Sequence, residues 1–285
     1  MAKLKVAEIF YSLQGEGRYT GVPSVFLRTF GCNFECRGFG LPKGERSTDP
    51  ENIAENIQLY KSYDDLPLAR TGCDSYASWH PSFKELSPMY DVQDVVKKME
   101  DLIPNKTWMQ PDGHDIHLVI TGGEPLLGWQ RVYPELIGQC QYNGLTNITF
   151  ETNGTQRITP EFAAWLNDVG APVSLFTFSV SPKLSCSGES WADAIQPDIV
   201  AEYESFGNAY LKFVVSNMDD VAEVDLAVKL YQAAGFSGPT YLMPAGGVED
   251  IYSLNAKQVA ALALEKGYRY SPRLQVDIWQ NAWGT

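Results

Sequence analysis

Histidine and basic residues are scarce in this sequence. Only three histidines occur, His80, His114 and His117, so the chain has few ligands for a metal site built mainly from imidazole. The 22 lysines and arginines are outnumbered by 35 aspartates and glutamates, the net charge is −13, and no basic run is longer than Lys97-Lys98. An acidic chain without a basic patch repels polyphosphate, so we expect no nucleic-acid partner.

Long apolar runs are missing too. No stretch approaches the roughly 18 apolar residues that a membrane-spanning helix needs, and Glu8 stands where a secretion signal would need an apolar core. We therefore expect a cytoplasmic protein without a membrane partner. The 24 glycines and 17 prolines are scattered over 285 residues, which excludes a collagen-like or disordered chain.

Short apolar segments alternate with longer segments of helical spacing, which predicts an α/β protein with a mainly parallel sheet and helical crossovers. We expect strands at Lys5–Phe10, Ser24–Thr29, Ile116–Thr121, Thr146–Glu151, Val173–Val180, Ala209–Val215, Tyr241–Pro244 and Arg273–Trp279. We expect helices at Val92–Leu102, Pro134–Cys140, Pro160–Asn167, Val221–Ala234 and Leu254–Lys266. Residues 37–72 and 184–208 break the alternation, and we expect them to be insertions on a single domain that spans residues 1–285.

The five cysteines are the first sign of chemistry. An odd number in a cytoplasmic chain favours thiols that are buried, reactive or metal-bound over a disulfide framework. Cys32 and Cys36 follow an expected strand in the sequence GCNFEC, and a loop there can turn both thiols toward one metal centre; two buried apolar thiols are the alternative. Cys140 lies in a helical pattern and Cys186 in a serine-rich loop, whereas Cys73 has a loop setting like that of the first pair. Three thiolates on an iron–sulfur cluster leave one iron open to a ligand.

Polar residues stand at the ends of three successive expected strands. These tips are Thr121-Gly122-Gly123-Glu124-Pro125, Glu151-Thr152-Asn153-Gly154 and Ser179-Val180-Ser181-Pro182-Lys183. Parallel α/β proteins build their sites at the carboxyl ends of the strands, so we expect the site there.

Together these motifs resemble the radical S-adenosylmethionine enzymes and, more narrowly, the 7-carboxy-7-deazaguanine synthase family. The resemblance covers nearly the whole chain, and its most specific element is Leu-Gln-Gly-Glu-Gly at positions 13–17. The matching segments are Glu8–Gly17, Thr20–Pro23, Phe26–Arg28, Gly31–Asn33, Cys73–Ser75 with Trp79, Ile120–Pro125, Glu151–Thr155, Ser181–Lys183 and Ser271–Leu274.

The resemblance implies an incomplete β/α barrel, a homodimer, a 4Fe–4S cluster, S-adenosylmethionine and Mg²⁺. In the family the adenosyl radical takes a hydrogen atom from 6-carboxy-5,6,7,8-tetrahydropterin. Ring contraction with loss of ammonia then gives 7-carboxy-7-deazaguanine, in queuosine-type biosynthesis. An electron donor such as flavodoxin or ferredoxin is implied as well.

The resemblance also implies a role for each matching residue. Cys32, Cys36 and Cys73 would hold the cluster, and Ser75 the magnesium ion. The residues implied for S-adenosylmethionine are Gly122, Gly123, Glu124, Asn153, Ser181, Pro182 and Lys183. Those implied for the pterin are Leu13, Gln14, Gly15, Glu16, Arg28 and Thr121, with the planar guanidinium of Arg28 suited to a carboxylate.

The chain departs from the family pattern in four places. Phe39 occupies the usual third cysteine position, and residues 37–72 precede Cys73; Ser75 replaces a threonine, Gln275 replaces a histidine, and the usual terminal proline is absent. Two alternatives stay open: another radical enzyme, such as a glycyl-radical activase, and a non-catalytic relative that binds zinc through its thiols.

Overall fold

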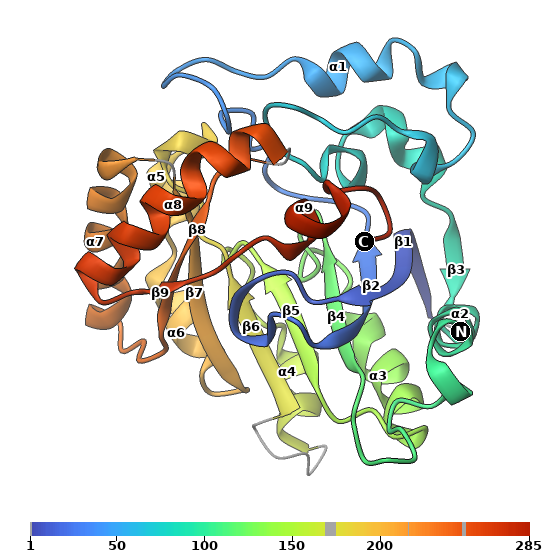
Figure 1. Cartoon of the computed structure of the whole chain (residues 1–285). Helices are drawn as coiled ribbons and strands as arrows, with labels where there is room; N and C mark the ends of the chain where they lie inside the picture. Colours follow the sequence, from blue (N-terminus) through green and yellow to red (C-terminus); the bar gives the residue numbers. More distant parts are fainter. Residues whose placement is uncertain (1, 169–174, 216, 247–248) are drawn as a thin grey trace.

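A single twisted sheet forms the centre of the molecule (Figure 1). The computed structural model describes residues 2–168, 175–215, 217–246 and 249–285. Within these ranges nine strands are hydrogen-bonded in the order β3-β1-β2-β4-β5-β6-β7-β8-β9. The strands are β1 Lys3–Leu13, β2 Pro23–Thr29, β3 Met89–Asp91, β4 His117–Gly122, β5 Ile148–Thr152, β6 Phe176–Val180, β7 Asn208–Val215, β8 Thr240–Pro244 and β9 Arg269–Tyr270.

The sheet is antiparallel at one side and parallel over the rest. β1 pairs with β2 and β3 antiparallel, and every pair from β2–β4 to β8–β9 is parallel. The register sets Thr29 beside Gly122 and Glu151 beside Ser179, so the polar strand ends meet at one edge. The predicted mainly parallel α/β sheet is therefore confirmed, and β1 and β3 are its antiparallel exception.

Helices α1 to α8 lie between the strands along the chain, and α9 follows the last strand. They are α1 Asp49–Ala54, α2 Val92–Leu102, α3 Tyr133–Tyr142, α4 Pro160–Asp168, α5 Trp191–Ala194, α6 Pro197–Tyr203, α7 Met218–Ala233, α8 Glu249–Lys266 and α9 Leu274–Trp279. Helix α2 begins after Asp91, as predicted, and buries Val92, Val95, Val96 and Met99. That spacing puts the four side chains on one face.

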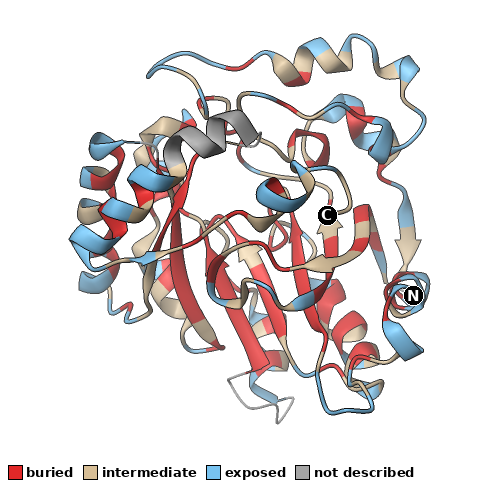
Figure 2. Cartoon of the chain, in the orientation of Figure 1, coloured by how far each residue is buried: buried red, intermediate tan, exposed pale blue. Residues whose placement is uncertain are grey.

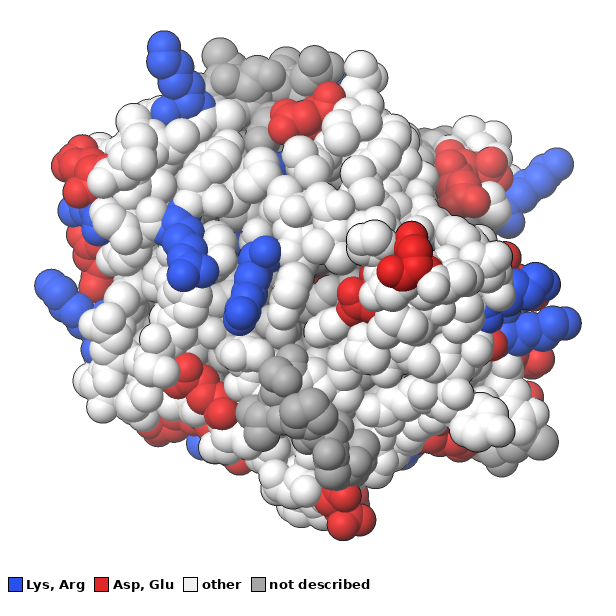
Figure 3. Space-filling view, turned by 60° about the horizontal axis from the view of Figure 1, so that its bottom comes forward, with Lys and Arg blue, Asp and Glu red and all other residues white. Residues whose placement is uncertain are grey.

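Burial follows this layering. Figure 2 shows β4 to β7 buried along most of their length, while α7 and α8 carry exposed residues. Parallel strands are covered on both faces, which explains their near-continuous apolar sequences. On the face drawn in Figure 3, charged side chains stand apart or in small groups with broad uncharged areas between them. Among the described residues, no helix is both long and apolar enough to cross a membrane.

The 37–72 segment shares a small hydrophobic core with the residues that follow it. Tyr63, Leu66 and Ala69 are buried there against Tyr76 and Phe83. In Figure 1 its helix α1 lies at the top of the molecule, on the side toward which β2 points. The segment therefore sits over the carboxyl edge of the sheet.

Two sequence predictions were wrong. Arg273–Trp279 is not a strand, because Leu274–Trp279 forms α9. The helix is followed by Gln280 and Asn281, both in left-handed conformations. Residues 184–208 are not an irregular insertion, because α5 and α6 lie there, and α6 buries Ile199, Val200 and Tyr203 as part of the β6–β7 crossover. The strand expected at Val173–Val180 begins at Phe176, and positions 173 and 174 lie outside the described residues.

Candidate active site

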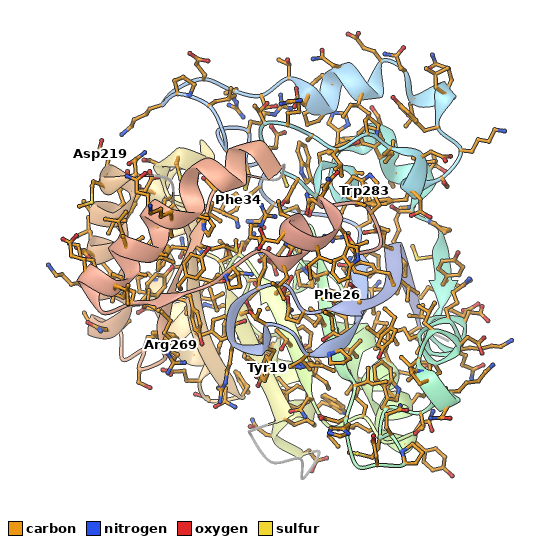
Figure 4. All side chains as sticks on the ribbon, in the orientation of Figure 1. Tyr19, Phe26, Phe34, Asp219, Arg269 and Trp283 are labelled. Atoms are coloured by element: carbon orange, nitrogen blue, oxygen red, sulfur yellow. The ribbon has the colours of Figure 1, made fainter. Side chains whose placement is uncertain are left out.

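The carboxyl edge of the sheet opens into a cavity of about 250 Å³. Its walls come from β1, β2 and β4 to β8, with parts of the 37–72 segment, α9 and residues 281–285. Figure 4 labels three of the lining residues, which come from separate parts of the chain: Phe26 on β2, Phe34 in the following loop and Trp283 near residue 285. The cavity thus lies at the polar strand ends.

Most residues singled out by the sequence line this one cavity. They are Leu13, Gln14, Gly15, Glu16, Arg28, Cys32, Cys36, Cys73, Ser75, Thr121, Gly122, Gly123, Asn153, Ser181 and Lys183. Glu124 and Pro182 do not line the cavity. Both are buried, and each is adjacent in sequence to a residue that does line it. Segments separated by more than 150 residues thus meet at one place.

Three cysteines converge on the cavity. Cys32, Cys36 and Cys73 are free thiols that share an apolar cluster with Phe34 and Ala194. Cys140 is buried in α3, Cys186 lies in the turn after β6, and neither lines the cavity. Cys73 is therefore the third thiol that meets the first pair.

The loop that carries Cys32 and Cys36 is held in place by a carboxylate. Glu189 Oε1 accepts the backbone N–H groups of Glu35 and Cys36 at 2.9 and 2.6 Å. Cys36 has φ 51°, a left-handed conformation that an L-residue adopts at some cost. The Glu189 contact helps to hold this strained turn, which aims the Cys36 thiol inward.

Burial keeps the three thiols protonated in the absence of metal. It raises the pKa of Cys32 to about 12 and that of Cys73 to about 11, and it raises the pKa of Cys36 well above its usual value. Metal binding must therefore release protons from these groups. In the described part of the chain, no three His, Cys, Asp or Glu side chains stand at the spacing of a single metal ion. A cluster differs from one ion because each thiolate binds a different iron.

A pair of glycines brings β4 close to the cysteine loop. A Cβ on Gly123 would lie 2.7 Å from the Cβ of Cys32 and would overlap the carbonyl oxygen of Gly31. A Cβ on Gly122, whose φ is 151°, would overlap the backbone of Thr29. Glycine is therefore required at both positions for the two loops to meet.

Glu124 organises the strand ends from behind the cavity. Its carboxylate accepts from the backbone N–H groups of Asn153 (2.7 Å) and Leu126 (2.9 Å) and from Thr152 Oγ1. Burial raises the pKa of Glu124 to about 7, against the opposing effect of these hydrogen bonds. Asn153 in turn donates to Asn33 Oδ1 at 2.9 Å, which ties β5 to the cysteine loop.

A buried charge network forms another part of the cavity wall. Glu16 accepts from Lys212 Nζ at 2.5 Å, from Arg273 Nε at 3.2 Å and from Gln275 Nε2 at 2.6 Å. Arg273 Nη2 also contacts Asp74 Oδ2 at 2.5 Å. Burial alone would raise the pKa of Glu16, but Lys212 and Arg273 outweigh it and lower the pKa to about 2. Glu16 is therefore an anion in the folded protein.

Arg28 bridges two parts of the cavity. Its Nε contacts Glu8 Oε2 at 2.8 Å and its Nη1 donates to Ser75 Oγ at 3.0 Å. Glu8 is 7% exposed and also accepts the backbone N–H of Gly284 at 3.0 Å. Arg28 thus links β1 and β2 to the loop after Cys73 while its side chain lines the cavity.

Gln14 and Thr121 are oriented by one carboxylate. Gln14 Nε2 donates to Glu151 Oε1 and Thr121 Oγ1 donates to Glu151 Oε2, both at 3.1 Å. Gln14 Oε1 accepts the backbone N–H of Glu16 at 3.0 Å. Glu151 therefore fixes the side chains of two residues that the sequence assigned to the substrate.

The cavity also has a wall from the 37–72 segment and the end of the chain. Ala69 and Arg70 line it from that segment, and Trp283 lines it from residues 281–285. Trp283 Nε1 donates to the carbonyl oxygen of Leu66 at 2.6 Å, and its ring packs edge-on against Tyr63 with ring centroids 4.8 Å apart. The segment and the chain end therefore hold each other in place.

Sequence reasoning gave no role to several lining residues: Glu8, Asp74, Glu151, Lys212, Arg273 and Gln275. The sequence could have indicated a role for Lys212, because it is a cation within the apolar strand β7. It could also have indicated a role for Asp74, which directly follows Cys73. The ion pairs of the lining residues join distant positions, such as Arg273 and Glu16, which are 257 residues apart, and no local pattern predicts such pairs.

The site defines a class of protein. Three free thiols, a glycine pair and paired charges around one cavity at the carboxyl edge of a parallel sheet are typical of a radical S-adenosylmethionine enzyme. Comparisons with known proteins narrow this to a family.

No family model matches the chain, but curated relatives do. It is 32% identical over 301 residues to the 7-carboxy-7-deazaguanine synthase of Halobacterium salinarum, covering 98% of this chain and 91% of the relative. The synthases of Pyrobaculum aerophilum and Rhodopirellula baltica are 29% and 28% identical, over 99% and 100% of this chain and 97% and 90% of the relatives. The crystal structure of QueE from Escherichia coli matches with a TM-score of 0.54 at 18% identity, over 94% of this chain and 93% of that chain, which supports the fold.

The chain belongs to the 7-carboxy-7-deazaguanine synthase family. It is a lyase of the radical S-adenosylmethionine class, in the biosynthesis of queuosine and related 7-deazapurines, and its cofactors are a 4Fe–4S cluster and S-adenosylmethionine.

Proposed function

We propose that the cavity binds 6-carboxy-5,6,7,8-tetrahydropterin and contracts its ring to 7-carboxy-7-deazaguanine, with release of ammonia. One observation carries this proposal: the three thiols share one cavity with Gln14, Glu16 and Arg28. Cluster ligands and substrate ligands must lie together if a radical formed at the cluster is to reach the substrate. The residues of the family motifs satisfy that condition in this chain.

Cys32, Cys36 and Cys73 hold the cluster in this proposal. Their free thiols suit it, since three thiolates leave one iron for S-adenosylmethionine. The cluster and the adenosyl cofactor, when bound, supply the radical chemistry, and the protein supplies positions and excludes water.

S-adenosylmethionine is assigned to the strand ends beside the cluster. Gly122 and Gly123 leave room for backbone contact, and Asn153, Ser181 and Lys183 line the same side with polar groups. Lys183 Nζ donates to Ser181 Oγ at 3.1 Å, so the pair presents a cation and a hydroxyl suited to a carboxylate. Glu124 and Pro182 act from behind the cavity in this assignment, Glu124 by fixing Asn153.

The pterin is assigned to the neighbouring part of the cavity wall, against Leu13, Gln14, Gly15, Glu16 and Thr121. Glu151 holds Gln14 and Thr121 in fixed orientations, so they need not be ordered on binding. Arg28 recognises the substrate carboxylate, because a guanidinium can bind that group through two parallel hydrogen bonds. Lys212 and Arg273 balance the carboxylates of Glu16 and Asp74 on this wall, so these two anions do not face the substrate carboxylate unpaired.

Magnesium is assigned to Ser75. Its Oγ lies 3.4 Å from Asp74 Oδ1, so two oxygen atoms of adjacent residues stand close together. Mg²⁺ prefers oxygen ligands and keeps several waters, so a hydroxyl is a sufficient anchor beside the substrate oxygens.

The remaining assignments concern the whole chain. We propose that the sheet is the incomplete β/α barrel of the radical S-adenosylmethionine class, in one domain whose 37–72 insertion separates Cys36 from Cys73. We further propose a homodimer, with flavodoxin or ferredoxin as the electron donor.

Anaerobic turnover tests the function. Reconstituted protein is incubated with S-adenosylmethionine, Mg²⁺, a reductant and the carboxy-tetrahydropterin, and the products are identified by mass. We expect 7-carboxy-7-deazaguanine and ammonia in equal amounts. The matched control is Cys32→Ala, which should form neither. Absence of product from wild-type protein with a full complement of iron would contradict the proposal.

A further inference from the structure

One wall of the cavity holds an acceptor that the chain itself does not satisfy. Gln275 lines the cavity from the first turn of α9. Its Oε1 is buried and has no hydrogen-bond partner among the described residues. A buried acceptor without a partner costs free energy, and native proteins contain few of them. Such an atom in a substrate cavity indicates that its donor comes with the substrate.

The orientation of the Gln275 amide follows from its neighbour. An ionised carboxylate has only acceptors, so the side of the amide that faces Glu16 must be the NH₂ group. Gln275 Nε2 donates to Glu16 Oε1 at 2.6 Å accordingly. The ion pairs with Lys212 and Arg273 lower the pKa of Glu16 and keep its carboxylate ionised. A flipped amide would set two acceptors against each other, so Oε1 is directed away from Glu16.

Gly15 defines where that acceptor lies. A Cβ on Gly15 would overlap Gln275 Oε1 and would lie 3.0 Å from its Cδ. The backbone N–H of Leu274 donates to the carbonyl oxygen of Gly15 at 3.1 Å, which holds the start of α9 against this residue. Gly15 belongs to the Leu13–Gly15 segment assigned to the pterin. Oε1 therefore stands at the wall where the substrate ring is assigned.

We propose that Gln275 is a substrate-binding residue whose Oε1 accepts a hydrogen bond from one N–H group of the pterin, with Glu16 fixing the orientation of its amide. This inference rests on the proposed function and adds a contact to it. The tetrahydropterin offers four kinds of N–H donor, on the 2-amine and on N3, N5 and N8. Because Oε1 accepts and cannot donate, it selects for a donor at one of these positions.

The chemical consequence is selectivity. A site built to accept an N–H rejects an analogue that lacks it, because the buried acceptor is then left unpaired. Loss of one such hydrogen bond corresponds to roughly 2- to 12-fold weaker binding. The matching N–H should therefore strengthen binding to the wild-type protein by that factor. It should have no effect on binding once Oε1 is removed.

Equilibrium binding of analogues tests the inference. Reconstituted protein with S-adenosylmethionine, but without reductant, is titrated anaerobically with the carboxy-tetrahydropterin and with four analogues that each lack one N–H group. The variants are Gln275→Met, which keeps the side-chain length but has neither donor nor acceptor of comparable strength, and Gln232→Met, an exposed control on α7. The dissociation constant of each analogue is divided by that of the parent pterin, measured with the same protein. A general loss of stability or affinity cancels from this ratio.

We expect wild type and Gln232→Met to bind one analogue more weakly than the parent pterin. In Gln275→Met, the ratio of the dissociation constant of that analogue to that of the parent should be roughly 2- to 12-fold smaller. If all four ratios were equal in wild type and Gln275→Met while the parent pterin still bound, Gln275 would not accept from the substrate. Failure of wild-type protein to bind the pterin at all would contradict the proposed function itself, and this inference with it.

Discussion

Arg28 has both a structural partner and a proposed substrate contact, and substitutions can separate the two. In Arg28→Ala, the buried carboxylate of Glu8 loses its ion pair at 2.8 Å, and among the described residues the backbone N–H of Gly284 is the donor that remains. Removing one partner of a buried ion pair costs about 3–5 kcal/mol, because the other charge is left uncompensated. The Arg28 side chain is 16% exposed and that of Glu8 is 5% exposed, so the lower end of this range is the better expectation for the free energy of unfolding.

The substrate contact adds a separate loss. An Arg–carboxylate contact that is desolvated in the complex is worth on the order of 2–5 kcal/mol, or about 30- to 4,000-fold in affinity. Arg28→Lys keeps the charge but loses the two-pronged geometry, so its pterin affinity should lie between wild type and Arg28→Ala. Affinity for S-adenosylmethionine should stay nearly level, because Arg28 is not among the residues assigned to that cofactor.

The double variant Glu8→Gln/Arg28→Ala distinguishes the two roles. It removes the uncompensated charge, so chemical denaturation should show a recovery of unfolding free energy relative to Arg28→Ala. Anaerobic titration should still show weak pterin binding. If pterin affinity returned together with stability, Arg28 would be structural, and the carboxylate contact would have to come from Lys183, Lys212 or Arg273.

Three further substitutions test separate parts of the account. Ser75→Ala should weaken the stimulation of turnover by Mg²⁺ while leaving visible cluster absorption intact, and an unchanged Mg²⁺ titration would count against that ligand. Gly123→Ala should displace the cysteine loop, because the new Cβ would overlap the backbone of that loop, and less iron should be retained after reconstitution. Gly138→Ala on α3 is the control, since a Cβ there meets open space, and it should retain full iron. Equal iron content in the two variants would refute the packing argument. Trp283→Ala removes the indole contacts that hold the 37–72 segment, so limited proteolysis should cut that segment faster than in wild type; cleavage at the wild-type rate would show that Trp283 does not secure it.

The strands were predictable because burial on both faces requires continuous apolar sequence. In β4 all six residues are buried, and Leu118, Val119 and Ile120 form a continuous apolar run. Helix α9 was mistaken for a strand because Leu274, Val276 and Ile278 alternate with polar residues. Only Val276 is buried there, so that alternation does not record a buried sheet face.

The site was predictable in its motifs but not in its charge partners. Cys73 stood in a loop setting like that of Cys32 and Cys36, and the structure brings all three to one cavity. By contrast, nothing local indicates that Glu16 pairs with Lys212 and Arg273, since these contacts depend on how β1, β7 and the start of α9 meet. Tertiary packing decides such pairs.

The most direct test of the central claim is the iron content of three cysteine variants after anaerobic reconstitution. The account predicts that wild type, Cys140→Ala and Cys186→Ala retain about four irons per chain with brown visible absorption, as a three-thiolate 4Fe–4S centre requires. Cys73→Ala should lose the absorption and most of the iron. Retention of the full cluster in Cys73→Ala, with its loss in Cys186→Ala, would contradict the assignment of the radical centre to this cavity.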